Sequence, residues 1–389
     1  RYPLPERDAA RLLIYRNGTI CEDRYHGIAQ FLPLGSLLVF NDTRVIDARL
    51  LFKKPSGGVI ELFCLDPAPE QTDLPGALQQ KGSVRWQCLV GGASKWKAGQ
   101  VLEKTGTDKE GNWLLQARYE GKGNGAFTIA FNWQPETLRF SEILQRAGAV
   151  PLPPYLRRAA ETSDRNRYQT VYAAKEGSVA APTAGLHFTE GVFSSLHDRQ
   201  IDTCFLTLHV GAGTFRPVTT ERMRDHDMHA EWIDVRAETI GRIRDRIGKA
   251  PVVAVGTTSL RTLETLYWMG VRILRNGPKT LTEEFGQWEA YELETRAVPG
   301  AEALQALMDC MEQQGLNRLI GRTRLLMAPG YRLRLAEGLV TNFHQPNSTL
   351  LLLVAAVIGE DWRSVYDHAL ANGFRFLSYG DGCLLWKTN

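Results

Sequence analysis

The sequence predicts an α/β protein, with a mixed-sheet α/β main domain and an inserted small β-barrel domain. Across most of the chain, short apolar runs typical of buried strands alternate with amphipathic segments of helical periodicity. Residues 51–134 differ, because strand-like runs there are separated by Gly and polar turns. A chain of 389 residues is also long for one hydrophobic core. We therefore expect a discontinuous α/β domain over 1–50 and 135–389, interrupted by a barrel over 51–134.

Apolar runs bounded by turn residues give the predicted strands. In the main domain these strands cover 11–15, 36–40, 201–210, 252–255 and 374–379, and a further one enters the polar segment 341–348. In the barrel they cover 59–65, 84–90, 113–119 and 126–131.

Helical periodicity and capping residues give the predicted helices. They cover 135–147, 190–196 after a Thr189 cap, the region of 240–247, a segment following 256–259, 301–314, 349–358 after a Ser348 cap, and 361–370. Residues 271–300 are polar, and we expect a loop or hairpin there.

Composition narrows the class of protein. The chain has 46 basic and 43 acidic residues, so its net charge of +3 indicates no general nucleic-acid binder but permits a local basic patch. Its six cysteines show no Cys-x-x-Cys pair, which favours reduced thiols. The apolar run 350–358 is too short to cross a bilayer. We expect a cytoplasmic protein without a membrane partner, and the sequence leaves monomer or weak homodimer open.

The most unusual stretch runs from 177 to 190. Residues 177–185 are small residues plus one proline, which suits close approach of backbone to a ligand and makes Thr183 and Gly185 candidate binding residues. His187 follows, with an unperturbed pKa near neutrality. The alternative is a buried turn with a satisfied histidine.

Polar residues recur just past four predicted strands, at 41–44, 256–259, 341–344 and 380–381. Open α/β sheets place ligands outside the carboxyl ends of strands, so these segments predict one shared site. The candidate residues are Asp42, Arg44, Thr257, Thr258, Ser259, Asn342, His344 and Asp381. The 256–259 turn also offers a helix N-terminus to an anion, and Arg261 in the first helical turn fits an anionic partner.

Two further motifs carry weaker signals. The loop with Gly211 and Gly213 has a Gly-x-Gly pattern but lacks the rest of a dinucleotide fingerprint. His226, His229 and Glu231 have a spacing that allows metal binding as an alternative to acid–base chemistry. Because no further strong ligand or second zinc-type cluster accompanies them, we expect no metal.

One basic segment is the best candidate for contacting nucleic acid. Five cations lie within twenty residues and are interleaved with Tyr155, Tyr168 and Tyr172. They are Arg157, Arg158, Arg165, Arg167 and Lys175. The alternative is a solvated charged face.

These blocks together resemble the S-adenosylmethionine:tRNA ribosyltransferase-isomerase family of queuosine biosynthesis. The resemblance extends in order from end to end, and the block 177–189 is its most specific part. The other matching blocks are 40–46, 168–172, 208–218, 254–259, 341–344 and 378–381.

The resemblance implies a reaction. Such enzymes transfer and isomerise the ribosyl group of S-adenosylmethionine onto 7-aminomethyl-7-deazaguanine in tRNA, giving epoxyqueuosine-tRNA, adenine and methionine. S-adenosylmethionine is a co-substrate, and no cofactor is implied. A base is needed to deprotonate the ribosyl carbon beside the sulfonium. Our hypothesis is that His187 or His229 is this base, oriented by Glu231 or Asp42, with His209 as a further catalytic candidate.

The resemblance also suggests substrate contacts, and it has departures. The 256–259 turn and Arg261 are candidates for the methionine carboxylate, and Asn342 and His344 for the deazaguanine base. The chain departs from the usual family pattern at Asp47, at 90–95 and at 345–347, and its 271–320 region is longer. The alternative is therefore a divergent paralogue that binds RNA or a nucleoside without this turnover, or that modifies another acceptor.

Overall fold

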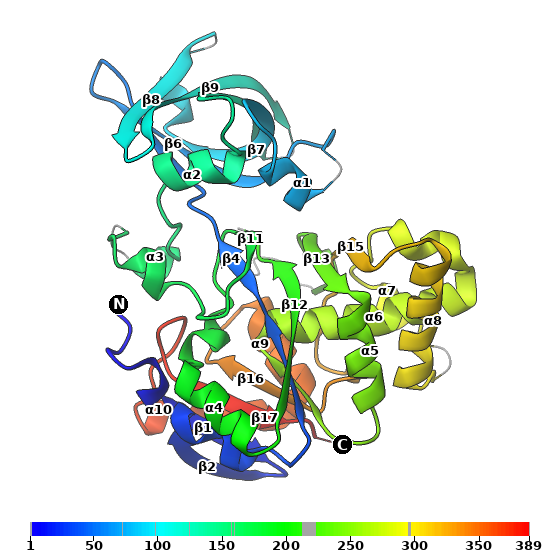
Figure 1. Ribbon diagram of the computed structural model, residues 1–389. Helices are drawn as coiled ribbons and strands as arrows, with labels where there is room; N and C mark the ends of the chain where they lie inside the picture. Colours follow the sequence, from blue (N-terminus) through cyan, green and yellow to red (C-terminus); the bar gives the residue numbers. More distant parts are fainter. Residues whose placement is uncertain are drawn as a thin grey trace.

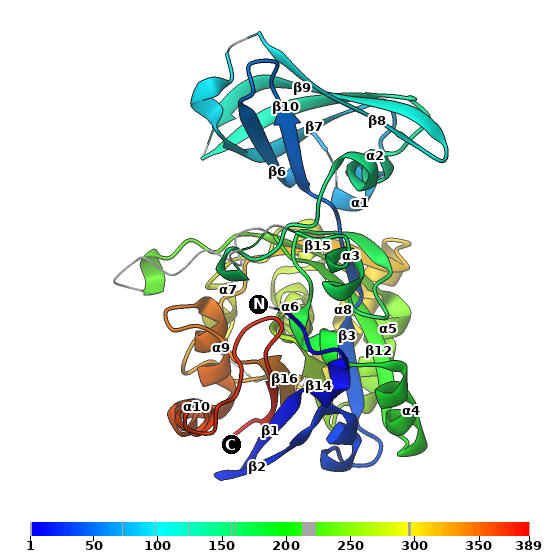
Figure 2. The ribbon, with the colours of Figure 1, turned by 90° about the vertical axis from the view of Figure 1, so that its left-hand side faces the viewer.

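The computed structural model describes residues 2–388 except 72, 98, 124, 157, 159, 212–222 and 295–296. The described chain forms a large mixed sheet with helices, and a six-stranded sheet that stands above it in Figure 1. Figure 2, turned by 90°, shows the same separation, with the segment around α3 lying between the two sheets. No helix in the described residues is long and apolar enough to cross a membrane.

The large sheet has nine strands in the order β15-β13-β12-β3-β14-β16-β17-β1-β2. β12, β3, β14 and β16 run parallel, β17 runs antiparallel to β16, and β1 runs parallel to β17. The strands are β1 (Arg11–Arg16), β2 (Thr19–Arg24), β3 (Leu37–Asn41), β12 (Asp202–His209), β13 (Glu231–Arg236), β14 (Val252–Val255), β15 (Arg318–Thr323), β16 (Gly338–Asn342) and β17 (Gly382–Trp386).

The central strands are buried on both faces. In β3, Leu37 and Val39 pack into one core cluster, whereas Leu38 and Phe40 pack into another. This follows from the alternation of side chains along a strand, and it explains why the run is continuously apolar. One face packs against α6 (Thr257–Asn276) and α8 (Gly300–Gln313), and the opposite face packs against α4 (Glu190–Asp198) and the 3-10 helix η2 (Tyr25–Phe31).

The helices are α1 (Leu74–Leu78), α2 (Phe140–Ala147), α3 (Asp164–Arg167), α4 (Glu190–Asp198), α5 (Ala237–Arg246), α6 (Thr257–Asn276), α7 (Glu289–Glu292), α8 (Gly300–Gln313), α9 (Thr349–Ile358) and α10 (Trp362–Ala371). Two predicted caps are confirmed: the Thr189 hydroxyl accepts from the amide of Val192, and the Ser348 hydroxyl from that of Leu351. These bonds satisfy amides that a helix N-terminus leaves unpaired.

The six-stranded sheet has the order β5-β6-β7-β10-β9-β8, with every neighbouring pair antiparallel. Its strands are β5 (Arg49–Lys53), β6 (Val59–Pro67), β7 (Ser83–Gly91), β8 (Val101–Asp108), β9 (Gly111–Gly123) and β10 (Ala126–Gln134). It has its own core cluster, which includes Trp86, Leu115 and Phe131, and its curvature makes it barrel-like (Figure 1). A separate pair joins β4 (Thr43–Val45) to β11 (Lys175–Ser178) in parallel.

Three sequence predictions about elements are wrong. Residues 374–379 form no strand; the last strand is β17, at 382–386. The expected loop at 271–300 begins too early, because α6 continues to Asn276. The helix expected from residue 135 begins only at Phe140. In addition, β5, β8 and the short α1 lie in the 51–134 region without having been predicted as separate elements.

Candidate functional site

The predicted meeting point of strand ends exists at one edge of the large sheet. The carboxyl ends of β3, β14 and β16 lie side by side because these strands are parallel neighbours. Asp381 reaches the same edge by a different route from the one predicted. It precedes β17, whose first residue, Gly382, pairs with Asn342 at the end of antiparallel β16.

A cavity of about 300 Å³ opens at this edge. Five predicted residues line it, namely Thr183, Thr257, Thr258, Asn342 and His344. Aromatic and proline side chains supply apolar wall, among them Tyr155, Tyr168 and Pro182. Within the described part of the chain, no Asp, Glu, Lys or Arg lines the cavity. Its polar surface therefore consists mainly of hydroxyl, amide and backbone groups.

The first turn of α6 forms one wall. Gly256 follows β14 with a φ of 93°, a value that residues with a side chain rarely adopt, and as the N-cap it places no side chain over the helix amides. Thr257 and Thr258 then line the cavity. The N-terminus of a 20-residue helix thus offers amide donors to a ligand in this space.

Asn41, at the end of β3, holds this wall in place. Its Oδ1 accepts from the amides of Leu208 and Thr43, at 3.0 and 3.1 Å. Its Nδ2 donates to the Leu208 carbonyl at 2.9 Å and to Thr258 Oγ1 at 3.1 Å. One fully buried amide therefore joins β3 to β12 and to α6. Asn41 opens the predicted polar segment 41–44, although only Asp42 and Arg44 were candidates from that segment.

His187 lies behind the cavity wall, in the 3-10 helix η5 (Thr183–His187). Its ring stacks on Tyr25 with centroids 4.3 Å apart, and its Nδ1 lies 3.0 Å from the Arg7 carbonyl oxygen. Burial lowers the pKa of His187 to about 4, so the ring is neutral at pH 7. Because a carbonyl only accepts, Nδ1 carries the proton, and Nε2 faces the amide nitrogen of Asn342 at 3.5 Å.

The expected orienting carboxylates do not serve His187. Asp42 accepts a hydrogen bond from the Thr207 hydroxyl at 2.6 Å, and burial raises the pKa of Asp42. Glu231 pairs instead with Arg261. In this structure β12 and α6 supply those carboxylates with other partners, and an orienting role for Asp42 or Glu231 stays a prediction.

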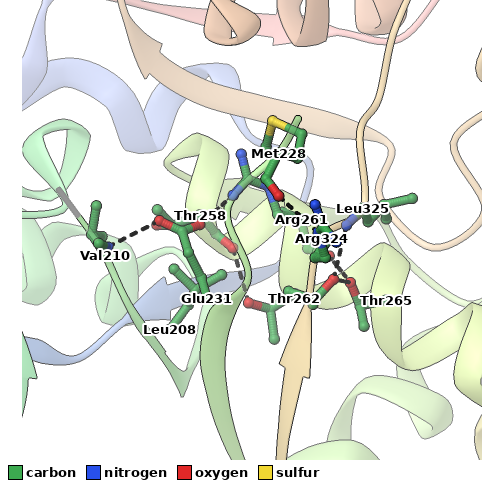
Figure 3. A network of polar contacts seen from close by, with 12 residues as sticks. Leu208, Val210, Met228, Glu231, Thr258, Arg261, Thr262, Thr265, Arg324 and Leu325 are labelled. Atoms are coloured by element: carbon green, nitrogen blue, oxygen red, sulfur yellow. Dashed lines mark hydrogen bonds and ion pairs between the residues drawn. The ribbon is translucent and has the colours of Figure 1, made fainter. Parts of the chain in front are cut away.

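Glu231 and Arg261 form a buried ion pair that joins α6 to the start of β13 (Figure 3). The side chains are 4% and 9% exposed, and Glu231 Oε1 also accepts from the amide of Gly211 at 3.1 Å. Arg261 is the fifth residue of α6, so its placement in the first turn was wrong. The anionic partner predicted for Arg261 is present within the chain. Arg261 does not line the cavity, and as a carboxylate ligand it stays an untested prediction.

The remaining candidates lie near the site without lining the cavity. His209 Nδ1 is 2.9 Å from Thr43 Oγ1, and burial lowers the pKa of His209 to about 4. Ser259 Oγ donates to the Val255 carbonyl.

A Cβ on Gly185 would lie 1.9 Å from the Tyr172 hydroxyl, so packing requires glycine there. Asp381 accepts from Arg375 and from the amide of Arg11, whereas Arg44 is exposed.

The predicted basic patch is largely engaged with the protein itself. Arg158 makes two hydrogen bonds to buried Asp164, at 2.6 and 2.7 Å. Arg165 contacts Asp47 and two carbonyls, and Arg167 donates to the carbonyls of Leu4 and Pro5. Lys175 is half-buried in β11. Arg157 and Gly213 lie outside the described residues.

His229 is exposed on the segment that leads into β13. Among the residues that the structure describes, no group of three or more His, Cys, Asp or Glu side chains is placed to hold a metal ion. The six cysteines are free thiols.

Comparison with known proteins places the chain in a family. The model of the family described as "Queuosine biosynthesis protein" matches residues 1–385. The chain belongs to this family.

The chain aligns with curated relatives over nearly its full length. The S-adenosylmethionine:tRNA ribosyltransferase-isomerase of Anaeromyxobacter sp. is 41% identical over 391 residues, covering 100% of this chain and 95% of the relative. The protein of the same name from Magnetococcus marinus is 37% identical, covering 99% and 89%. The crystal structure of the S-adenosylmethionine tRNA ribosyltransferase from Thermotoga maritima is 26% identical, covers 98% of this chain and 94% of that one, and has a TM-score of 0.44.

Proposed function

We propose that this protein is an S-adenosylmethionine:tRNA ribosyltransferase-isomerase. It transfers and isomerises the ribosyl group of S-adenosylmethionine onto 7-aminomethyl-7-deazaguanine in tRNA, giving epoxyqueuosine-tRNA with release of adenine and methionine. The observation that carries this proposal is the family match over residues 1–385, together with the 35–41% identity of its relatives. The cavity at the predicted sheet edge supports it, because five residues from the family-like segments line that space.

S-adenosylmethionine is consumed in this proposal, and no metal or redox cofactor takes part. The ribosyl carbon beside the sulfonium must lose a proton, and departing adenine must gain one. For the base we favour His229 over His187. Burial holds the pKa of His187 at about 4, which makes its neutral ring a weak base, whereas His229 is exposed.

The six-stranded sheet is proposed to be an inserted domain that helps to hold tRNA. Its strands span residues 49–134 and share one core cluster, which supports folding as a unit. Limited proteolysis that releases a stable fragment close to 51–134 would agree with this division. A tRNA substrate and free thiols are consistent with a cytoplasmic enzyme.

The test of the reaction is direct. Purified protein is mixed with S-adenosylmethionine and tRNA that carries 7-aminomethyl-7-deazaguanine, and adenine and methionine are measured by chromatography. We expect both products in equal amounts, together with an epoxycyclopentanediol mass gain on the tRNA. The matched control is the same tRNA with guanine at that position. Absence of all three products, beside an active relative such as the Anaeromyxobacter enzyme, would refute the proposal.

A further inference from the structure

The hydrogen-bonding polarity of two cavity hydroxyls is fixed by the asparagine side chains that bond them. Thr183 and Thr258 both line the cavity, and each hydroxyl is engaged by a buried asparagine amide. A hydroxyl donates one proton and accepts through two lone pairs, so a neighbour that takes one role leaves the other for a ligand. The orientation of each amide therefore decides what the cavity offers.

At Thr183 the neighbours leave one arrangement. The amide of Asn342 lies between Thr183 on one side and two acceptors on the other, the Asp381 carbonyl at 3.4 Å and His187 Nε2 at 3.5 Å. His187 Nε2 is an acceptor because Nδ1 carries the proton toward the Arg7 carbonyl. Asn342 therefore turns its NH₂ group toward these acceptors and its Oδ1 toward Thr183.

The Thr183 hydroxyl must then donate to Asn342 Oδ1, which it does at 2.7 Å. Only lone pairs of the Thr183 oxygen remain, so this residue presents an acceptor to the cavity. The contact is independent of solvent, since Asn342 is 2% exposed. His187 acts here through Asn342 and is a positioning residue.

At Thr258 the arrangement is the reverse. Two backbone amides donate to Asn41 Oδ1, so Asn41 Nδ2 must face the Leu208 carbonyl and Thr258. Nδ2 donates to Thr258 Oγ1, and within the described part of the chain the Thr258 hydroxyl proton has no acceptor. Thr258 therefore presents a donor to the cavity.

We propose that this cavity binds an uncharged purine-type base, with Thr183 accepting from a ring amine or N–H group and Thr258 donating to a lone pair of the base. A planar neutral base fits a space walled by Tyr155 and Tyr168 and lined, in the described residues, without charged side chains. This inference rests on the proposed function, which supplies two such bases: the adenine of S-adenosylmethionine and the 7-deazaguanine of tRNA.

The first arm of the test exchanges the base without changing the protein. Adenine has an amine donor at position 6 and an acceptor at N1, whereas hypoxanthine has an acceptor at position 6 and a donor at N1. Binding of S-adenosylhomocysteine and S-inosylhomocysteine to the full-length protein is measured by titration calorimetry. We expect the adenine compound to bind about 10- to 100-fold more tightly, because the inverted edge leaves buried polar groups unpaired.

The second arm changes the protein and compares the two sources of the base. Thr183→Val should weaken S-adenosylhomocysteine about tenfold and bring the two nucleosides within about threefold of each other. Thr183→Ser keeps the acceptor and should preserve the discrimination. Thr105→Val, at an exposed position of β8, is the matched control and should change nothing. The free base 7-aminomethyl-7-deazaguanine is titrated into the same variants.

Loss of affinity for that free base alone, in Thr183→Val and Thr258→Val, would assign the cavity to the tRNA base and still support the proposal. Equal binding of the two nucleosides by the unaltered protein, with free-base affinity unchanged in both variants, overturns it. The outcome is separable from that of the reaction assay. Turnover without any of these binding effects refutes the pocket assignment alone, and discrimination without turnover refutes the proposed reaction alone.

Discussion

Two groups of side chains in the first five residues of α6 use opposite chemistry. Thr257 and Thr258 present hydroxyl and amide groups to the cavity. Arg261, one helical turn further on, instead forms a buried ion pair with Glu231 and ties α6 to β13. A charge removed from water needs a fixed partner, whereas a neutral hydroxyl can exchange one partner for another at low cost.

This difference suggests a division of labour. The buried charges hold chain segments together, and the neutral groups remain available to a ligand. The same contrast recurs at Arg158, whose guanidinium is bound by buried Asp164.

Acid should have the largest effect on stability, because it places charge on two buried histidine rings that are neutral at pH 7. Burial lowers the pKa of His187 and of His344 to about 4, compared with 6.5 for an unperturbed histidine. The stability that each neutral ring contributes is therefore complete above pH 6.5 and is lost as pH falls toward 4. The loss approaches about 3 kcal/mol for each ring.

Urea unfolding at several pH values between 7 and 4 measures this loss. The double variant His187→Gln/His344→Gln should show a clearly shallower dependence on pH. His197→Gln, exposed on α4, is the control and should keep the slope of the parent. An unchanged slope in the double variant would contradict the expectation.

Breaking the buried Glu231–Arg261 ion pair should lower stability by nearly as much. Glu231→Gln leaves the Arg261 guanidinium buried without its counter-charge, and we expect a loss of about 3–5 kcal/mol in unfolding free energy. The matched change Glu61→Gln breaks the Arg49–Glu61 pair, whose side chains are 36% and 35% exposed, and should cost less than about 1 kcal/mol. Denaturant unfolding of both variants tests this, and equal losses would remove the contrast.

The sequence predicted the elements that carry regular periodicity and caps, and it missed those that depend on tertiary packing. The run 374–379 has strand-like composition, but Phe374 and Phe376 pack around Phe343 in an irregular segment. Leu377 also has a φ of 72°, which is outside the extended conformation of a strand. The fully buried run 382–386 forms the strand instead. Polar Arg272 likewise concealed the length of α6, because it is buried and donates to the carbonyls of 280, 283 and 284.

For the site, the sequence predicted which segments meet but not which side chains pair. Strand ends at 41–44, 256–259 and 341–344 reach one sheet edge because parallel neighbours end together. The partners of Arg261 and His187 lie far away in the sequence, so no local pattern specifies them. The roles of the candidate residues in catalysis stay predictions.

Removing the positioning residue should affect substrate binding more than chemistry. In His187→Gln we expect KM for S-adenosylmethionine to rise about tenfold, because Asn342 loses a fixed neighbour. The two limbs of the pH profile of kcat should stay in place. His197→Gln serves again as the control. If His187 is the base, kcat should instead fall by about 10²- to 10⁴-fold and one limb should disappear.

The smallest effect should come from an exposed cation. Arg44 is the exposed middle residue of β4, so Arg44→Ala should reduce tRNA affinity less than tenfold and leave unfolding free energy unchanged. If Arg44 contacts one phosphate, the slope of log affinity against log salt should become shallower by about 0.9. Arg158→Ala should instead lower the unfolding free energy, because it leaves the buried carboxylate of Asp164 without its counter-charge. If Arg158→Ala changes the salt slope and Arg44→Ala does not, the paired Arg158 contacts the RNA and the exposed Arg44 does not.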